Sequence, residues 1–383
     1  MNVLTALNVI RQFSERVNAS PITLDSAACV RSRHKSADCS ACVDACPTSA
    51  FSVDGEGGGL TLDGDRCVGC AACTHLCPTG AIHSRTSADR LLKHVEQHGD
   101  AARVELICPY REPVNRQADR DSAAFITPRC LAALAPSTYV ELANRGVRHI
   151  TLRLDACADC PISHAAQTIC ETAAAAADLL RAAPMTTIVL VSEPPAGKRN
   201  LSDLHDTRQT SVSRRGLFQM FTRPLTEPSD VPRLSLPVRL TAEQQRLLPA
   251  VVERALQTSD MPDWAPRLVA DDSCTGCDVC AKLCPTAALS LQRDDAHFWL
   301  HFRAAYCTGC GLCTAGCPSH ALDLAPDHQP TDPAAVSSEI LVEGALQTCK
   351  RCRTAFRAAP GETLCPTCAF RRKNPFGSRV ISL

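Results

Sequence analysis

Four cysteine runs, each closed by a proline, constrain the fold of this 383-residue chain more than any other feature. Three of them have the spacing C-x2-C-x2-C-x3-C-P and begin at Cys67, Cys274 and Cys307, while a stretched variant runs from Cys29 to Cys46. Thiolates at this spacing wrap a cubane [4Fe–4S] cluster, and the cysteine before the proline ligates the neighbouring cluster. Because the runs form two close pairs, the sequence predicts two modules that hold two clusters each.

The crossing of the last cysteine predicts which thiolates share a cluster. Each set takes three cysteines from one run and the last cysteine of its partner run. The four predicted sets are Cys67, Cys70, Cys73 and Cys46; Cys29, Cys39, Cys42 and Cys77; Cys274, Cys277, Cys280 and Cys317; and Cys307, Cys310, Cys313 and Cys284. Zinc or disulfides are the alternative, but the proline after each run favours clusters. Gly69, Gly276 and Gly309 precede the second cysteine of three runs, where a residue without a Cβ atom lets the loop turn tightly.

Cys29 is the weakest of these predicted ligands. Nine residues separate it from Cys39, where two are usual, and four of the nine are basic or histidine: Arg31, Arg33, His34 and Lys35. They would form a basic flap that raises the reduction potential of a nearby cluster, because positive charge favours the reduced, more negative form. The alternative is that Cys29 is a bystander and the site holds a three-iron or labile cluster.

Both pairs of cysteine runs resemble two-cluster bacterial ferredoxins, and the resemblance covers about 120 residues of the chain. It implies a fold in which each cubane pair lies between short hairpins and helices. It also implies one-electron transfer at low potential, as in a relay that offers no side chain to a substrate.

Residues 87–192 have a different pattern, in which helices and strands alternate. Helices are predicted over 88–97, 136–144 and 165–183, and strands over 103–108, 124–127, 149–154 and 187–191. This alternation predicts a small parallel α/β domain. Four cysteines follow its strands, and loops at the carboxyl ends of parallel strands are where such folds bind ligands. They are Cys108, Cys130, Cys157 and Cys160.

This segment resembles the delta subunit of methyl-viologen-reducing hydrogenases, which works beside heterodisulfide reductase. The resemblance lies in Pro128–Leu131, in the helix around Val140–Leu142 that ends near Gly146, and in Asp155–Pro161. It implies a [2Fe–2S] cluster on the four cysteines and a role in passing electrons between a redox enzyme and an electron-splitting partner. The sequence departs from the family before Cys130, where the family has a closer cysteine pair.

One other interpretation of this segment stays open. It could be a metal-free α/β spacer between the cysteine modules. Cys170 lies within a predicted helix, in the stretch Ile169-Cys170-Glu171, and is predicted to be a core thiol rather than a ligand.

The C-terminal segment has the paired cysteine spacing of a zinc ribbon, in which thiolates close a tetrahedral structural site. Its predicted ligands are Cys349, Cys352, Cys365 and Cys368. Rubredoxin-type iron is the alternative, although the twelve-residue gap is short for it. Residues 349–383 contain eight Lys and Arg and one acidic residue, so they carry +7 while residues 1–348 carry −7. Because the acidic body opposes nucleic-acid binding, the tail is predicted to dock on an acidic partner or on the body itself.

The expected organisation is an α+β fold in six parts. They are an N-terminal helix (1–19), a first ferredoxin-like module (20–86), the α/β domain (87–192), a linker (193–236), a helix with the second module (237–330) and the zinc ribbon with its basic tail (345–383). Thr241 and Gln244 predict a capping box for the helix of the fifth part. A paired arginine at Arg214–Arg215 is interpreted as a contact motif of the linker, because it lies mid-chain rather than in a leader.

The 25 cysteines at metal-ligand spacings point to a reducing compartment, the cytoplasm, and no apolar run is long enough to span a bilayer. The chain has no flavin or nicotinamide fingerprint. The leading prediction is a multi-cluster electron-transfer protein that works with redox-enzyme subunits as donor and acceptor, in a hydrogenase-like or heterodisulfide-reductase-like complex. The alternatives are a thiol, disulfide or persulfide reductase using Cys157 and Cys160, and a redox-sensing zinc-ribbon regulator.

Overall fold

The computed structural model describes residues 22–34, 37–53, 58–84, 88–97, 102–109, 122–181, 184–193, 204–208, 240–258, 265–325, 338–358 and 361–373. Several expectations lie outside these residues, among them the N-terminal helix over 1–19, the paired arginine and most of the linker. The chain divides into two units, one made of residues 1–32, 40–237 and 241–262 and the other of residues 33–39, 238–240 and 263–383. Each unit is described by itself.

A five-stranded sheet in the order β8-β7-β5-β6-β9, with every pair parallel, forms the α/β part of the first unit. The strands are β5 (Arg103–Ile107), β6 (Ala123–Ile126), β7 (His149–Arg153), β8 (Thr187–Val191) and β9 (Leu204–Asp206). The chain passes from β5 to β6 on one side and then to β7 on the other. The carboxyl ends of β5 and β7 therefore flank a topological switch point, where open α/β sheets bind ligands.

The predicted parallel sheet is confirmed, with one strand more than expected. β9 lies within the segment predicted as a linker and pairs in parallel with β6, and the Thr207 hydroxyl after it donates to the carbonyl oxygen of Ile126 at 2.6 Å. Its three residues, Leu-His-Asp, carry a single apolar side chain. Such a short edge strand therefore has no periodicity that sequence patterns can detect.

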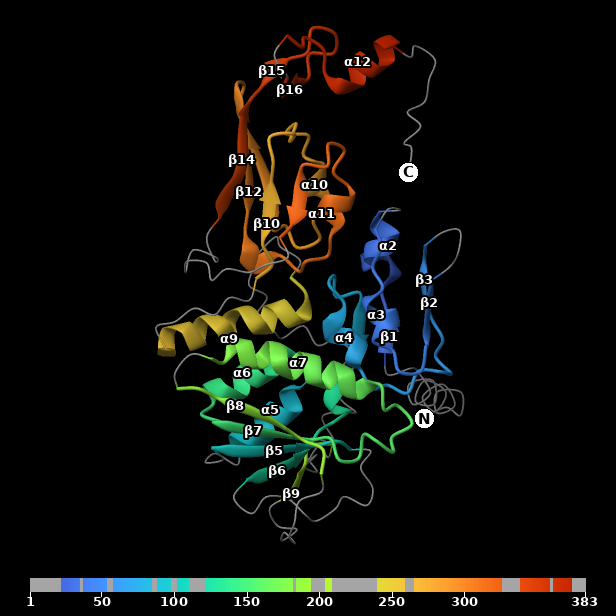
Figure 1. Ribbon diagram of the computed structural model, residues 1–383, viewed down its shortest axis with the longest axis vertical. Helices are drawn as coiled ribbons and strands as arrows, with labels where there is room; N and C mark the ends of the chain where they lie inside the picture. The colour runs from blue at the N-terminus through green and yellow to red at the C-terminus, as the bar shows by residue number, and fades with distance from the viewer. Residues whose placement is uncertain are drawn as a thin grey trace, which may run out of the picture. The chain divides into compact units, whose positions relative to one another are not determined.

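The helices of this domain are α5 (Asp89–Gln97), α6 (Pro136–Asn144) and α7 (Ala165–Leu179), with a short 3-10 turn η2 (Leu131–Ala133). α6 packs against α5 and α7, and α6 and α7 lie on the same side of the sheet (Figure 1). This placement follows from right-handed crossovers that run in one direction, from β6 to β7 and from β7 to β8. α7 ends at Leu179, before the predicted Ala183, with Leu180 at its C-cap.

α9 (Ala242–Thr258) begins with the predicted capping box. The Thr241 N–H donates to Gln244 Oε1 at 3.1 Å, and the Gln244 N–H donates to Thr241 Oγ1 at 3.2 Å. The helix packs against α6 of the first unit, where Glu243 accepts hydrogen bonds from the N–H and the hydroxyl of Ser137 at 2.8 and 2.6 Å. The structure thus places α9 with the α/β domain, whereas the boundary at 237 groups it with the second module.

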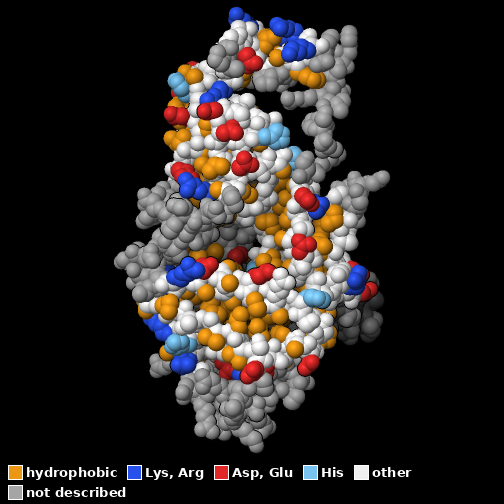
Figure 2. Space-filling view, viewed as in Figure 1, with side chains coloured by type: hydrophobic (Ala, Val, Ile, Leu, Met, Phe, Trp, Pro, Cys, Tyr) orange, Lys and Arg blue, Asp and Glu red, His pale blue; other side chains and the backbone are white. Residues whose placement is uncertain are grey.

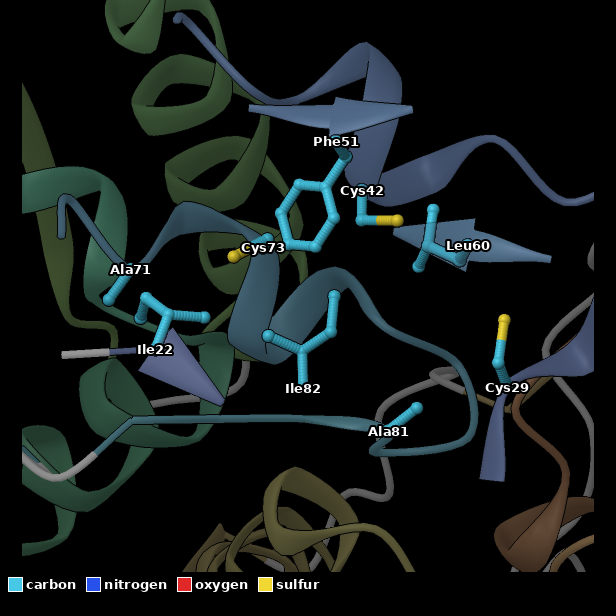
Figure 3. Close-up of a cluster of buried hydrophobic side chains, with 9 residues drawn as sticks. All are labelled: Ile22, Cys29, Cys42, Phe51, Leu60, Ala71, Cys73, Ala81 and Ile82. Carbon is cyan, nitrogen blue, oxygen red and sulfur yellow. The ribbon is translucent and has the colours of Figure 1, made fainter. Parts of the chain in front are cut away.

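The first cysteine module consists of two short antiparallel pairs and short helices. β1 (Ile22–Leu24) pairs with β4 (Ile82–Ser84), and β2 (Phe51–Val53) pairs with β3 (Leu60–Leu62). The helical pieces are η1 (Ser26–Ala28), α2 (Val30–Arg33), α3 (Ala41–Asp44) and α4 (Ala72–Leu76). Cysteines are part of the buried core, together with Ile22, Phe51, Leu60 and Ile82 (Figure 3).

The second module repeats this plan in the other unit. β10 (Leu268–Ala270) pairs with β13 (Leu322–Leu324), and β11 (Leu289–Arg293) pairs with β12 (His297–Phe302), which is extended by β14 (Glu339–Ala345). Its helical pieces are α10 (Val279–Leu283), η4 (Ala304–Tyr306) and α11 (Leu312–Ala315). The ribbon follows with β15 (Gln347–Thr348), β16 (Ala355–Phe356) and α12 (Pro366–Lys373), and Lys and Arg side chains gather over it (Figure 2).

Among the residues that the structure describes, no helix combines the length and the apolar character that crossing a membrane requires.

Candidate iron–sulfur and metal sites

The last cysteine of every run has the same local geometry. Its Sγ accepts a hydrogen bond of 3.2 to 3.3 Å from the backbone N–H four residues later and has a hydroxyl 3.6 to 3.7 Å away two residues later. The residue between them has a left-handed φ of 49 to 64°. The four cysteines are Cys46, Cys77, Cys284 and Cys317; the N–H donors are Ala50, Ala81, Ala288 and Ala321; the hydroxyls belong to Thr48, Thr79, Thr286 and Ser319.

This geometry stabilises negative charge on the sulfur, because hydrogen bonds to a thiolate favour its ionised form. At Cys46 burial alone would raise the pKa, but the N–H of Ala50 and the groups of Thr48 together lower it. Sequence reasoning missed these donors, although the signal was present. Each run ends in C-P-[ST]-x-A, with a hydroxyl at the second position after the cysteine and an alanine at the fourth.

The loops between the first and third cysteines also repeat in three runs. Gly69, Gly276 and Gly309, which precede the second cysteine, have φ values of 62 to 67°. The residues that follow it (Ala71, Asp278 and Gly311) also have left-handed φ values, from 65 to 72°. The run of Cys39 differs, because Ser40 after that cysteine has a φ of −118°. The stretched run thus enters its site by another backbone path.

Thiols of the predicted sets lie close enough to repel one another as thiolates. Burial first, and then the charges of neighbouring cysteines, raise the pKa of three central thiols, to about 12 for Cys280 and Cys313 and further for Cys73. The largest charge contributions come from Cys70, Cys46 and Cys67 for Cys73; from Cys274, Cys277 and Cys317 for Cys280; and from Cys307, Cys310 and Cys284 for Cys313, with smaller ones from Cys42 at Cys73 and from Cys280 at Cys313.

The cysteines with the largest contributions are the other members of each predicted set, with the crossing cysteine included. Two cavities of the second module are likewise lined by the cysteines of one predicted set each. One is lined by all four cysteines of the Cys274 set and the other by all four of the Cys307 set. Several thiolates cannot share a buried site without a cation, so the donor chemistry fits an iron–sulfur cluster.

The Cys29 set is gathered less completely. Cys29 and Cys42 belong to the buried cluster of the first module, and Cys77 packs against it. In Figure 3, Cys42 and Cys73 lie beside the Phe51 ring, whereas Cys29 lies apart from them. Cys39 belongs to residues 33–39, which group with the second unit, so its part in this set stays a prediction.

A cavity of about 250 Å³ lies at the switch point of the α/β sheet and is lined by Cys108, Cys130, Cys157 and Cys160. Cys108 directly follows β5, Cys130 follows β6, and the other two follow β7. The hydrogen bond with Cys108 and burial raise the pKa of Cys130, so these two sulfurs are in contact. Burial, with the charges of Cys108 and Cys160, raises the pKa of Cys157 to about 11. The four sulfurs thus line one cavity, with those of Cys108 and Cys130 in contact and Cys157 close to Cys108 and Cys160.

The predicted core position of Cys170 is wrong. Its side chain is exposed on α7, on the outer face of the helix, while its neighbour Ile169 points inward with only 1% of its surface exposed.

Sequence reasoning missed Arg153, which lines the same cavity. It is buried and ion-paired with Glu105 and Asp155, both at 3.1 Å.

The first module contacts the α/β domain beside this cavity. Nη1 of Arg129 donates to the carbonyl oxygen of Gly69, inside the Cys67–Cys70 loop, at 2.8 Å. The charge of Cys70 contributes to the raised pKa of Cys130, so these two thiols lie near each other. A second contact joins α4 to α7, where Nε2 of the buried His75 lies 3.3 Å from Oγ1 of Thr172. Burial lowers the pKa of His75 to about 4, so it is neutral at physiological pH.

The ribbon cysteines form a different kind of site. The sulfurs of Cys349, Cys352, Cys365 and Cys368 all lie within 4.8 Å of one another, and those of Cys352 and Cys365 are 3.6 Å apart. A zinc ion with Zn–S bonds of about 2.3 Å holds tetrahedral sulfurs about 3.8 Å apart. Backbone N–H groups, those of Cys352 and Cys365 above all, lower the pKa of Cys349 to about 6. This cluster of thiols could therefore bind a single metal ion.

Residues 37–81 and 273–321 each match the family model of the 4Fe-4S dicluster domain. The two modules are 4Fe–4S dicluster domains. The chain is thus an iron–sulfur electron-transfer protein with [4Fe–4S] cofactors. The first match begins after Cys29, and the two matches include neither the α/β sheet nor the ribbon. A search of curated proteins found no match to this chain.

Proposed function

We propose that this protein relays electrons one at a time between a donor and an acceptor within a larger oxidoreductase complex. The four cysteine sets described above would hold four [4Fe–4S] clusters, which supply one-electron redox chemistry at low potential. The observation that carries the proposal is the contact between the first 4Fe–4S dicluster domain and the α/β domain beside its cysteine-lined cavity. Arg129 of the α/β domain donates a hydrogen bond to the carbonyl oxygen of Gly69 in the Cys67–Cys70 loop, and Cys70 lies near Cys130.

The α/β domain would hold a [2Fe–2S] cluster on Cys108, Cys130, Cys157 and Cys160. Its support is the gathering of the four cysteines around one cavity, their place at the switch point of the sheet and the resemblance to the hydrogenase delta subunit. That resemblance also suggests the setting, a hydrogenase-like or heterodisulfide-reductase-like complex in the cytoplasm. The chain would serve there as a subunit or partner.

The ribbon would hold structural zinc rather than rubredoxin-type iron, because closed sets of four cysteines at this pair spacing are typical of zinc. Its exposed basic side chains include Arg371, Arg372 and Lys373 at the end of α12. Since the rest of the chain is acidic, this surface would dock on an acidic protein rather than on nucleic acid.

Cys130→Ser is expected to lower the iron content of the full-length protein by about two ions per chain and to remove the [2Fe–2S] EPR signal, while the cubane signals stay. Cys170→Ser is the matched control, because that cysteine is exposed on α7 and lies outside the predicted set. Iron analysis and EPR spectroscopy of anaerobically purified proteins measure both effects. An unchanged spectrum in Cys130→Ser would refute the [2Fe–2S] assignment.

A second candidate function is reduction of a disulfide or persulfide by Cys157 and Cys160, since both line a cavity large enough for a small substrate. The pKa of Cys157, raised to about 11, opposes it, because a reactive thiol needs a lowered pKa. The two functions predict different reactivity of Cys157 and Cys160 toward iodoacetamide. Cluster ligands in the intact holoprotein would resist alkylation, whereas a free dithiol would be alkylated.

A further inference from the structure

Arg357 joins the C-terminal ribbon to a cluster-binding loop of the second module. It directly follows β16, and its Nη1 donates to the carbonyl oxygen of Cys274 at 3.4 Å, while its Nη2 lies 3.2 Å from Oδ1 of Asp272. The Asp272 side chain is 97% exposed, so this ion pair contributes little stability. We therefore looked for a role of Arg357 other than stabilising the fold.

The same loop is packed from its other side by Phe298 of β12, which is fully buried. A Cβ atom on Gly276 would lie 2.9 Å from the Phe298 ring, and one on Gly344 of β14 would lie 2.7 Å from that ring and 3.1 Å from Arg357. Both glycines thus permit close approaches that another residue would prevent. The Phe298 ring thus lies against Gly276 of the Cys274–Cys277 loop, and the ring and the Arg357 side chain both lie against Gly344.

The guanidinium also acts on the sulfur electrostatically. Its Nη1 lies 3.4 Å from the carbonyl oxygen of Cys274, so a positive charge stands beside the first predicted ligand of the cluster. Reduction adds one negative charge to a cluster and its ligands, so a fixed positive charge nearby favours the reduced state.

The position of Arg357 depends on the ribbon. Its neighbour Phe356 belongs to the buried core of the ribbon, which otherwise consists of Cys349, Cys365 and Cys368. A core this small has little apolar area of its own, so a bound metal ion would hold it together. The position of the Arg357 guanidinium would therefore depend on metal binding in the ribbon.

We propose that the ribbon sets a redox potential. Its bound metal fixes Arg357 as a positioning residue beside Cys274, and the guanidinium raises the reduction potential of the cluster on Cys274, Cys277, Cys280 and Cys317. The inference rests on the proposed function, because it requires that cluster. It gives the ribbon a role in electron transfer in addition to its structural one.

The test is an EPR-monitored redox titration of full-length holoprotein. Arg357→Gln is expected to move one cubane reduction step to a more negative potential, by a threefold to tenfold loss in the equilibrium constant for reduction, where tenfold is about 59 mV for one electron. Arg357→Lys should restore most of the shift, because it keeps the charge. Arg181→Gln removes an equal charge from an exposed side chain of the α/β domain and should leave every step unchanged.

The coupling to metal is tested with Cys368→Ser, which breaks the ribbon site. Cys368→Ser alone should shift the cubane potential as much as Arg357→Gln does. Combining the two changes should shift the potential no further, since both remove the same interaction between the guanidinium and the cluster. Unmoved steps in Arg357→Gln, with all clusters present, would overturn the inference and leave the relay intact. A wild-type protein without cubane signals would overturn the proposed function, and this inference with it.

Discussion

Replacing Cys317 by serine is expected to remove the cluster of the Cys274 run and to leave the cluster of its own run, which begins at Cys307, in place. The reason is that Cys317 lies among the thiols of the other run, where its charge helps to raise the pKa of Cys280. Its Sγ also accepts the N–H of Ala321, which positions it as a thiolate donor. The loss should be about four iron ions per chain.

Double variants show which thiols share a cluster. Cys274→Ser with Cys317→Ser should lose no more iron than either single change, because both remove ligands of one cluster. Cys307→Ser with Cys317→Ser should lose about eight ions, because two clusters are affected. Iron and acid-labile sulfide per chain measure these losses. The opposite pattern would show that each run keeps its own last cysteine and would contradict the crossing.

Removal of the ribbon metal is expected to unfold residues 347–373 while the second module keeps its fold. Among the described residues of the ribbon, the core contains four buried side chains, three of them cysteines, so metal binding is expected to supply most of its folding energy. Structural zinc contributes about 10–16 kcal/mol of apparent binding free energy in comparable small domains. Hydrogen exchange should then become fast at β15, β16 and α12 but stay slow at β12.

Metal analysis of the same sample identifies the ion, with one zinc per chain expected. A strong chelator that spares the clusters provides the treatment, and the EPR signals of the cubanes serve as the control for intact modules. Protection of α12 that survives complete removal of the metal would contradict the metal-dependent ribbon.

The α/β domain was the part of the fold that the sequence predicted best. Its inner strands β5, β6 and β7 are mostly buried and appear in the sequence as short apolar runs. α6 and the edge strand β8 have the predicted bounds, Pro136–Asn144 and Thr187–Val191. Strand β9 was missed because three residues with one apolar side chain carry no pattern. The packing of α9 on α6 was missed because it depends on pairs such as Ser137 and Glu243, which stand 106 residues apart.

The candidate cluster sites were also predicted only in part. Spacing along the chain predicts which cysteines belong to one run, and the structure brings together the crossing sets of the second module and the Cys67 set of the first. Spacing cannot reveal partners from distant elements. Arg129 and Arg357 lie 60 and 83 residues from the loops whose carbonyl oxygens they bind, and no local pattern marks either residue.

The central claim, four cubanes in two dicluster domains with a further cluster in the α/β domain, is tested most directly by iron and acid-labile sulfide analysis of anaerobically purified protein together with EPR spectroscopy. The account predicts about eighteen iron ions per chain, sixteen from the cubanes and two from the cavity of Cys108 and Cys130. A value near sixteen would remove the [2Fe–2S] cluster alone. A value near eight would contradict the four-cubane relay.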